Sequence, residues 1–207
     1  MDGLDEVCDV VARNRDRADA TARLTPEALE AGNHAGLWTL VAPRESGGHE
    51  LSLPELLAVV ERVGAADPTV AWHAVNSGST GMAAAWLPED ERRAVFGERA
   101  PFGFAGSATG ARAKPVEGGY WLEGSWPFMT GAADARWSTV VAMVVDGDGE
   151  RPPGRPDIRR FVVPMTDLEI HDTWGAASSM RGTGSQAVST PGVSSRGAAR
   201  STPRTRC

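Results

Sequence analysis

The stretch KPVEGGYWLEGSWPFMTG, residues 114–131, decides the fold because two extended runs meet at a pair of glycines. The first run ends at Val116 and the second begins at Tyr120, so Gly118-Gly119 is the expected hairpin turn. The far end of the second run is unusual, because proline cannot donate to a sheet and an aromatic residue stands on each side of it. The stretch therefore predicts a hairpin whose second strand ends in Trp126-Pro127-Phe128, either as core packing or as a wall for a flat aromatic ligand.

More extended segments follow this hairpin, whereas helical patterns precede it. Residues 138–145 and 158–163 are apolar, β-branched runs, and residues 168–171 form a shorter one. Before residue 100, apolar spacings of three and four predict a helix over 5–22. Helices first and strands second indicate an α+β protein of two segregated units.

Capping signals mark where the further helices begin. Thr25-Pro26 places an N-cap residue before a proline in the first turn, and Asp67-Pro68 repeats that arrangement. Ser52 and Glu55 form a capping-box pattern. We therefore predict a helical N-terminal domain over residues 1–100 and a middle β-barrel-like domain over 101–186. Residues 187–207 are rich in Ser, Arg, Thr and Pro, and we expect them to be disordered.

Composition excludes several classes of function. The 207 residues carry a net charge of −6, which argues against a nucleic-acid partner. No apolar run reaches the roughly 18 residues that a membrane span needs, and the acidic N-terminus does not resemble a secretory leader. Cys8 and Cys207 form no CxxC pair. We therefore expect a cytoplasmic protein without a disulfide framework.

Two short motifs resemble a dinucleotide-binding site and a calcium-binding loop, but the surrounding sequence does not support either. RGTGSQA, residues 181–187, satisfies a dinucleotide-binding spacing, but no helix follows it and no βαβ unit surrounds it. DGDGE, residues 146–150, resembles the start of a calcium loop without the later ligands. The histidines show no metal-ligand spacing, so we expect no metal site. His73 stays a catalytic candidate, against the plainer interpretation of a partly exposed or hydrogen-bonded helix histidine.

Two segments suit a flavin. FGFAGSATG, residues 102–110, is a loop of small residues that exposes backbone groups and allows a ligand to approach closely. A flavin ring also needs an apolar wall and a donor near its N5 and O4 atoms. Phe128 is suited to be the wall, and the Thr130 hydroxyl is suited to be the donor.

Three segments in order resemble the acyl-CoA dehydrogenase superfamily. They are GLWTLVAPRESGGHELSLPELLAVVERVGAADPTVAW (36–72), GSATGARAKPVEGGYWLEGSWPFMTGAADARW (106–137) and DTWGAASSMRGTGSQ (172–186). They are similar to the helical N-terminal domain, the start of the middle β-domain, and a later strand of that domain. The WPFxTG form is closer to the flavin-dependent monooxygenase branch than to the fatty acyl dehydrogenases.

The resemblance implies a cofactor site. The residues that correspond to the family's flavin site are Phe104, Ala105, Gly106 and Ser107 beside the pyrimidine ring, Phe128 as the aromatic wall, Thr130 beside the N5/O4 edge, and Gly131 after it. FAD is the cofactor that the family implies, with FMN as the alternative. The usual glutamate-proline segment is absent at 106–110, and Thr80 stands near the position of a histidine that is common in the monooxygenase branch.

The resemblance implies an oxidoreductase that acts on the CH–CH bond of an acyl-thioester-like substrate. The alternative is a two-component monooxygenase that hydroxylates an aromatic or polycyclic small molecule with electrons from a separate flavin reductase. The similarity stops after Gln186, before the C-terminal helical bundle that supplies the family's catalytic glutamate and the core of its homo-oligomer. A frameshifted or truncated, inactive fragment is therefore the third expectation.

Overall fold

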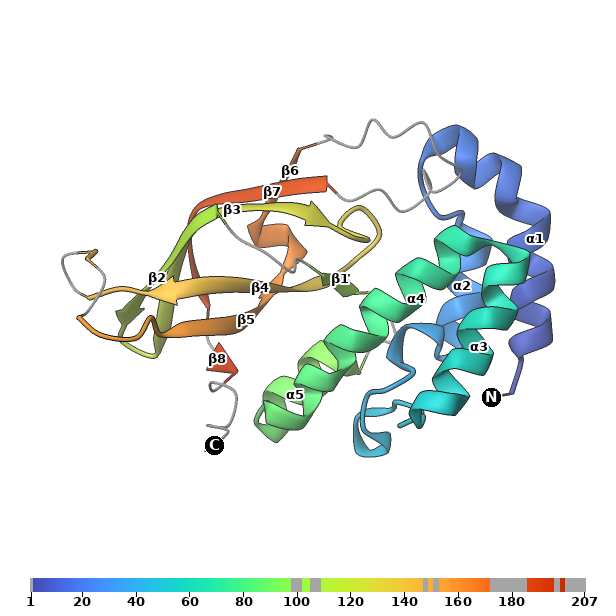
Figure 1. Cartoon of the computed structure of the whole chain (residues 1–207), viewed down its shortest axis with the longest axis horizontal. Helices are drawn as coiled ribbons and strands as arrows, with labels where there is room; N and C mark the ends of the chain where they lie inside the picture. Colours follow the sequence, from blue (N-terminus) through green and yellow to red (C-terminus); the bar gives the residue numbers. More distant parts are fainter. Residues whose placement is uncertain are drawn as a thin grey trace.

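The computed structural model describes residues 2–97, 102–104, 109–146, 149–150, 153–171, 186–195 and 198–199. Helices come first and strands second, so the chain has the predicted α+β arrangement (Figure 1). The helices are α1 (Leu4–Thr21), α2 (Pro26–Ala35), α3 (Leu53–Ala66), α4 (Pro68–Gly81) and α5 (Glu89–Phe96), with the 3-10 turns η1 (Leu37–Thr39), η2 (Arg44–Ser46) and η3 (Met82–Trp86) among them. The strands are β1 (Phe102–Phe104), β2 (Thr109–Val116), β3 (Gly119–Met129), β4 (Trp137–Val144), β5 (Ile158–Pro164), β6 (Glu169–His171), β7 (Gln186–Ser195) and β8 (Ala198–Ala199), with the 3-10 turn η4 (Met165–Asp167) before β6.

The predicted caps start the helices. The Thr25 hydroxyl accepts a hydrogen bond from the Ala28 N–H at 3.3 Å, and Ser52 forms the capping box with Glu55 at the start of α3. Asp67 serves two helices at once. Its N–H donates to the Val63 carbonyl at the end of α3, and its carboxylate accepts from the N–H groups of Thr69 and Val70 at the start of α4. A single residue thus joins α3 to α4.

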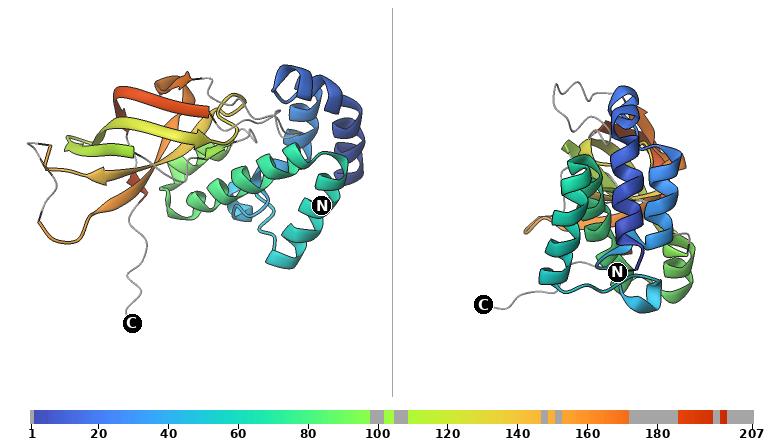
Figure 2. Two further views of the ribbon diagram at one scale, coloured as in Figure 1. Left: turned by 45° about the horizontal axis from the view of Figure 1, so that its top comes forward. Right: turned by 90° about the vertical axis from the view of Figure 1, so that its right-hand side faces the viewer.

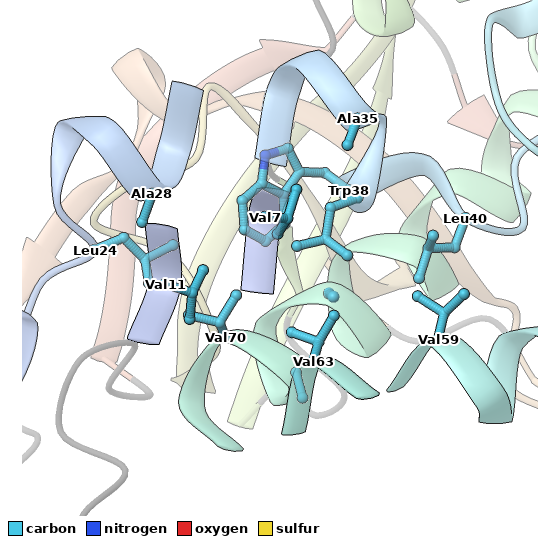
Figure 3. Packing of buried hydrophobic residues seen from close by; sticks show 13 residues of the cluster. Val7, Val11, Leu24, Ala28, Ala35, Trp38, Leu40, Val59, Val63 and Val70 are labelled. Atoms are coloured by element: carbon cyan, nitrogen blue, oxygen red, sulfur yellow. The ribbon is translucent and has the colours of Figure 1, made fainter. Parts of the chain in front are cut away.

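The helical unit encloses a core of its own. Figure 3 shows aliphatic side chains from α1, α2, α3 and α4 gathered around Trp38. Trp38 is fully buried, and its indole N–H donates to the Asn33 side chain at 2.7 Å. The buried members of this core are Val7, Val11, Leu24, Ala28, Ala35, Leu37, Trp38, Leu40, Val59, Val63, Val70, Ala71 and Ala74.

The strands of the described residues form one mixed, curled sheet in the order β6-β7-β3-β2-β4-β5-β8, with β1 paired to β4. β2 and β3 are the predicted hairpin, with Val116 opposite Gly119. β4 pairs in parallel with both β1 and β2, whereas the other pairs are antiparallel. Alternate residues of β3, β4 and β5, such as Leu122, Val140 and Phe161, face a common core.

The two units pack against each other through α4 and α5. A third cluster joins Leu87, Val95 and Phe96 from the helical unit to Phe102 of β1 and Val162 of β5. The rings of Phe96 and Phe102 lie 4.8 Å apart between centroids. Figure 2 shows the helices gathered at one end of the sheet, with α4 leading toward it.

The expected disorder of residues 187–207 differs from the structure over two segments. β7 pairs antiparallel with β3 from Met129–Gln186 to Tyr120–Ser195, and β8 pairs with β5. β3 is paired to β2 on one side only, so its other edge offers backbone groups that a second strand satisfies. Strand pairing uses backbone N–H and C=O groups, so a segment poor in apolar side chains can still pair with β3.

Some sequence predictions lie outside the described residues. These are the small-residue loop at Ala105, Gly106 and Ser107, most of the dinucleotide-like spacing at 181–187, and residues 200–207. Within the described part, no helix is long and apolar enough to cross a membrane.

Candidate functional site

The far end of β3 departs from the strand's own alternation. Leu122 and Trp126 point into the sheet core, so a regular strand would also bury Phe128. Instead Phe128 has a φ of +59°, its side chain is 68% exposed, and Met129 takes the buried position. The pairing with β7 shifts register between Trp126 and Met129, as a β-bulge does. The bulge therefore turns one aromatic ring outward while the strand stays paired.

The two aromatic residues that flank Pro127 have different roles. Trp126 is fully buried, and its indole N–H donates to the Val141 carbonyl at 2.8 Å. Phe128 is the exposed one, and a bulky residue at positive φ is a conformational outlier. Trp126 thus packs in the core, whereas a role of Phe128 as the wall for a flat aromatic ligand stays a prediction.

Thr130 and Gly131 carry the chain from β3 into a turn that approaches α4 (Figure 1). Thr130 is buried, and Gly131 has a φ of +74°. A Cβ atom at Gly131 would collide with the His73 imidazole, with Cδ2 only 2.8 Å away. Only glycine fits here, because the backbone conformation and the neighbouring ring both exclude a side chain.

His73 lies in α4 between the helical core and this turn. It is fully buried, and its ring centroid lies 5.1 Å from that of Trp38. Burial lowers the pKa of His73 to about 4. Neither ring nitrogen has a hydrogen-bond partner among the described residues, so the expectation of a partly exposed or hydrogen-bonded histidine is wrong in both respects. The imidazole is neutral at neutral pH.

β1 brings the start of the small-residue loop to the same place. The Phe102 N–H donates to the Ser77 hydroxyl at 2.9 Å, and that hydroxyl donates to the Trp38 carbonyl at 3.0 Å. On its other side, Ser138 donates to the Gly103 carbonyl at 3.0 Å, and a Cβ at Gly103 would lie 3.2 Å from the Met129 sulfur. The chain therefore reaches Phe104 next to the strand end that carries Phe128.

Two serines that fix β1 escaped the sequence reasoning. Ser77 appears there only as one of the small residues of a helix, and Ser138 only as the start of a β-branched run. Their hydroxyls reach across 25 and 35 residues of sequence, respectively. Local spacing carries no sign of such contacts.

A carboxylate in the turn after Gly131 is a further feature that the sequence did not reveal. Asp134 accepts a hydrogen bond from the Leu24 N–H at 3.5 Å, and Arg23 donates to the Ala133 carbonyl at 3.0 Å. Burial raises the pKa of Asp134 to about 6, against the opposing effects of the Leu24 N–H and Arg23. These contacts tie the turn to the loop between α1 and α2.

The segment from Phe128 to Gly131 presents an exposed aromatic edge. Among the described residues, no three His, Cys, Asp or Glu side chains gather to hold a metal ion. Hollows at the start of α1 and between η2 and α5 are lined by no residue of the Phe128–Asp134 segment. What the segment offers is an outward ring, a hydroxyl-bearing residue next to a tight turn, and nearby backbone from β1.

Comparison with known proteins agrees with this architecture. Residues 5–95 match the family described as "Acyl-CoA dehydrogenase, N-terminal domain". The structure of XiaF from Streptomyces sp. in complex with FADH2 and glycerol superposes with a TM-score of 0.80 at 27% identity, over 95% of this chain and 48% of that one. TdsC from Paenibacillus sp. A11-2 with FMN and indole shares the fold at 24% identity and a TM-score of 0.73, over 94% of this chain and 51% of that one.

Two curated relatives are components of flavin-dependent hydroxylating systems. One is the flavin-dependent monooxygenase oxygenase subunit HsaA of Mycobacterium tuberculosis (strain CDC 1551 / Oshkosh), 29% identical over 182 residues, which are 84% of this chain and 44% of that protein. The other is the oxygenase component of the FADH(2)-dependent resorcinol hydroxylase of Rhizobium sp. (strain MTP-10005), 27% identical over 172 residues, with 81% and 40% coverage. This chain thus spans less than half the length of both.

The order of units and the superpositions define an α+β protein with the acyl-CoA dehydrogenase fold. More particularly, the chain belongs to the acyl-CoA dehydrogenase superfamily, as the sequence resemblance predicts, and the relatives named above lie in its flavin-dependent monooxygenase branch. These relatives favour the hydroxylating alternative over the expected action on an acyl thioester.

Proposed function

We propose that this chain provides the flavin-binding half of the oxygenase component of a two-component, flavin-dependent monooxygenase. Its substrate is an aromatic or polycyclic small molecule, and a separate flavin reductase supplies the reduced cofactor. The kinship with HsaA and with the resorcinol hydroxylase component supports this proposal. The reduced flavin is FADH2 in the first instance, with reduced FMN as the alternative.

The observation that carries the proposal is the conformation of Phe128. A phenylalanine at a φ of +59° with a 68% exposed ring has neither a relaxed backbone nor a buried side chain. Such an arrangement costs about 1–2 kcal/mol per residue, and strained, exposed residues of this kind concentrate at ligand sites. A flat, apolar ligand stacked on the ring accounts for the outward turn.

The residues present fit a flavin ring. Phe128 would hold one face of the ring, and the hydroxyl of Thr130, two residues further along the chain, would serve as the donor at the ring edge. Gly131 permits the backbone to turn away from the ligand at a φ of +74°. When bound, a reduced flavin supplies two electrons to dioxygen, so that one oxygen atom enters the substrate and the other leaves as water. The chain's own residues bind and orient it and exclude water from one face.

Flavin binding by the purified chain is the test. FADH2 under anaerobic conditions, FAD and FMN are titrated separately, with flavin absorbance and fluorescence as the readout. Stacking on an aromatic ring contributes about 1–3 kcal/mol, so Phe128→Ala should weaken binding about tenfold. Trp121→Ala is the matched control, because Trp121 is an exposed aromatic residue at the other end of the same strand.

The outcomes separate the three functions. Hydroxylation of an aromatic substrate with FADH2 and dioxygen supports the monooxygenase, whereas desaturation of an acyl thioester with oxidised FAD supports the dehydrogenase. Flavin binding with neither reaction would identify a binding-competent but inactive half. Failure to bind any of the three flavins, or equal losses in Phe128→Ala and Trp121→Ala, would refute the proposed site.

A further inference from the structure

The His73 side chain is buried in a way that its chemistry does not explain. Both ring nitrogens lack a hydrogen-bond partner among the described residues, although the side chain is fully buried. Buried polar atoms in proteins are nearly always hydrogen-bonded, and an exception calls for a specific cause. A phenylalanine or leucine would fill an apolar space at lower cost. Volume alone therefore does not account for a histidine here.

The position of the ring suggests that cause. The imidazole lies next to Trp38, a central side chain of the helical core, with the two ring planes inclined by 42°. It also lies against Gly131, so close that no side chain fits at that position. The ring is thus clamped between the helical core and the turn that ends β3. The three heavy atoms nearest to a Cβ atom at Gly131 all belong to the His73 ring.

The neighbouring contact on α4 reinforces the clamp. One helical turn after His73, Ser77 links the Trp38 carbonyl to the Phe102 N–H. The same helix face therefore fixes both segments that approach the flavin in the proposed function, the start of β1 and the end of β3.

We propose that His73 is the positioning residue of this site, whose ring packs on Gly131 and thereby fixes where Phe128 and Thr130 stand. The inference rests on the proposed function for what the strand end binds. His73 does not touch the cofactor in this role, because it acts through Gly131. It differs from the catalytic role considered for His73 in the sequence, since no proton is transferred.

A double-mutant cycle tests the clamp with FAD affinity as the readout. Gly131→Ala should weaken FAD binding at least about tenfold in the His73 background, because the new methyl group collides with the ring. In the His73→Ala background the same substitution should cost less than about threefold, since the collision is gone and only the backbone strain remains. His73→Ala alone should weaken binding by about threefold or more.

A matched glycine supplies the control. Gly118 has a φ of +78°, close to that of Gly131, but a Cβ there meets nothing within 4 Å. Gly118→Ala should leave FAD affinity unchanged in both backgrounds. If the effects of Gly131→Ala and His73→Ala on affinity simply add, His73 is an ordinary core residue and the proposal is wrong.

A second measurement needs no flavin. Hydrogen exchange of the unliganded protein should show faster exchange for residues 129–135 in His73→Ala, with the β2–β3 hairpin unchanged. Equal exchange in both segments overturns the positioning role. If the wild-type chain binds no flavin but this local effect is seen, the proposed function fails while the clamp on the turn stands.

Discussion

The two ends of β3 start from similar residues and reach different structures. Each end has a glycine at positive φ, Gly118 at +78° and Gly131 at +74°, and each carries an exposed aromatic residue, Trp121 or Phe128. At the hairpin end, a Cβ on the glycine would meet open space. At the far end, the glycine is packed against a buried imidazole and the aromatic residue is at positive φ.

The surroundings of Gly118 and Gly131 indicate a different role for each glycine. Gly118 satisfies only the geometry of a tight turn, which many sequences achieve. Gly131 satisfies the turn and also leaves room for another part of the chain. The far end therefore joins the two units of the molecule, whereas the hairpin end closes a local ladder.

Alanine at the two glycines should show the largest contrast. Gly131→Ala should lower the free energy of unfolding by about 4 kcal/mol, of which about 1 arises from positive φ and about 3 from the collision with His73. Gly118→Ala should cost only about 1 kcal/mol, for φ alone. Urea unfolding of both variants measures the difference, and similar losses would remove the contrast between the ends.

Lowering the pH should destabilise the protein through His73, which lies at the far end of β3. The folded imidazole takes up a proton only near pH 4, whereas the unfolded one does so near 6.5. Between these values the unfolded state binds more protons, so the free energy of unfolding falls by about 3 kcal/mol as the pH decreases. His73→Phe should remove this loss. Denaturant titrations at neutral pH and at about pH 4.5 provide the comparison; an unchanged acid sensitivity in the variant would contradict it.

Asp134 should change the free energy of unfolding in the opposite direction over a similar range of pH. Its pKa rises from 3.8 to about 6 on folding, so the folded state holds the proton more tightly. The stabilisation is complete below pH 3.8 and is lost as the pH rises through about 6. Asp134→Asn should therefore raise the free energy of unfolding by about 2 kcal/mol at pH 8 and leave it nearly unchanged in acid.

The difference in the free energy of unfolding between Asp134→Asn and the parent should depend on pH. A pH-independent effect of Asp134→Asn would mean that folding does not raise the pKa of the Asp134 carboxyl.

Glycine at the two aromatic positions should give effects of opposite sign. Phe128→Gly relieves the positive φ and removes little buried surface, so it should stabilise the protein by about 1 kcal/mol while weakening flavin binding. Trp121→Gly should destabilise by about 1 kcal/mol, because glycine within a strand is unfavourable. Thermal melts together with FAD titration check both. Destabilisation by Phe128→Gly would show that the backbone at residue 128 is not strained.

The predictable part of this molecule is the part whose causes are local. Thr25, Ser52 and Asp67 begin helices because their side chains bond to the next turn, and Gly118-Gly119 closes a hairpin by the same short-range chemistry. The class of fold and the resemblance to the acyl-CoA dehydrogenase superfamily followed from such segments in order.

What escaped prediction depends on contacts between distant segments. The outward turn of Phe128 comes from a bulge in its pairing with β7, and the raised pKa of Asp134 comes from burial against the loop at Leu24, 110 residues earlier. The composition of residues 187–195 predicts disorder, whereas the structure pairs these residues with the edge of β3, which their composition does not reveal. A role in flavin binding remains a prediction for all seven residues named from the resemblance, which are Phe104, Ala105, Gly106, Ser107, Phe128, Thr130 and Gly131.

The joint at Asp67 has a mechanical consequence. Asp67 ends α3 and begins α4, so no loop between the two helices allows one to move independently of the other. α4 carries His73 and Ser77, which hold the end of β3 and the start of β1. A displacement of α3 should therefore move α4 with it and act, through His73 and Ser77, on the end of β3 and the start of β1.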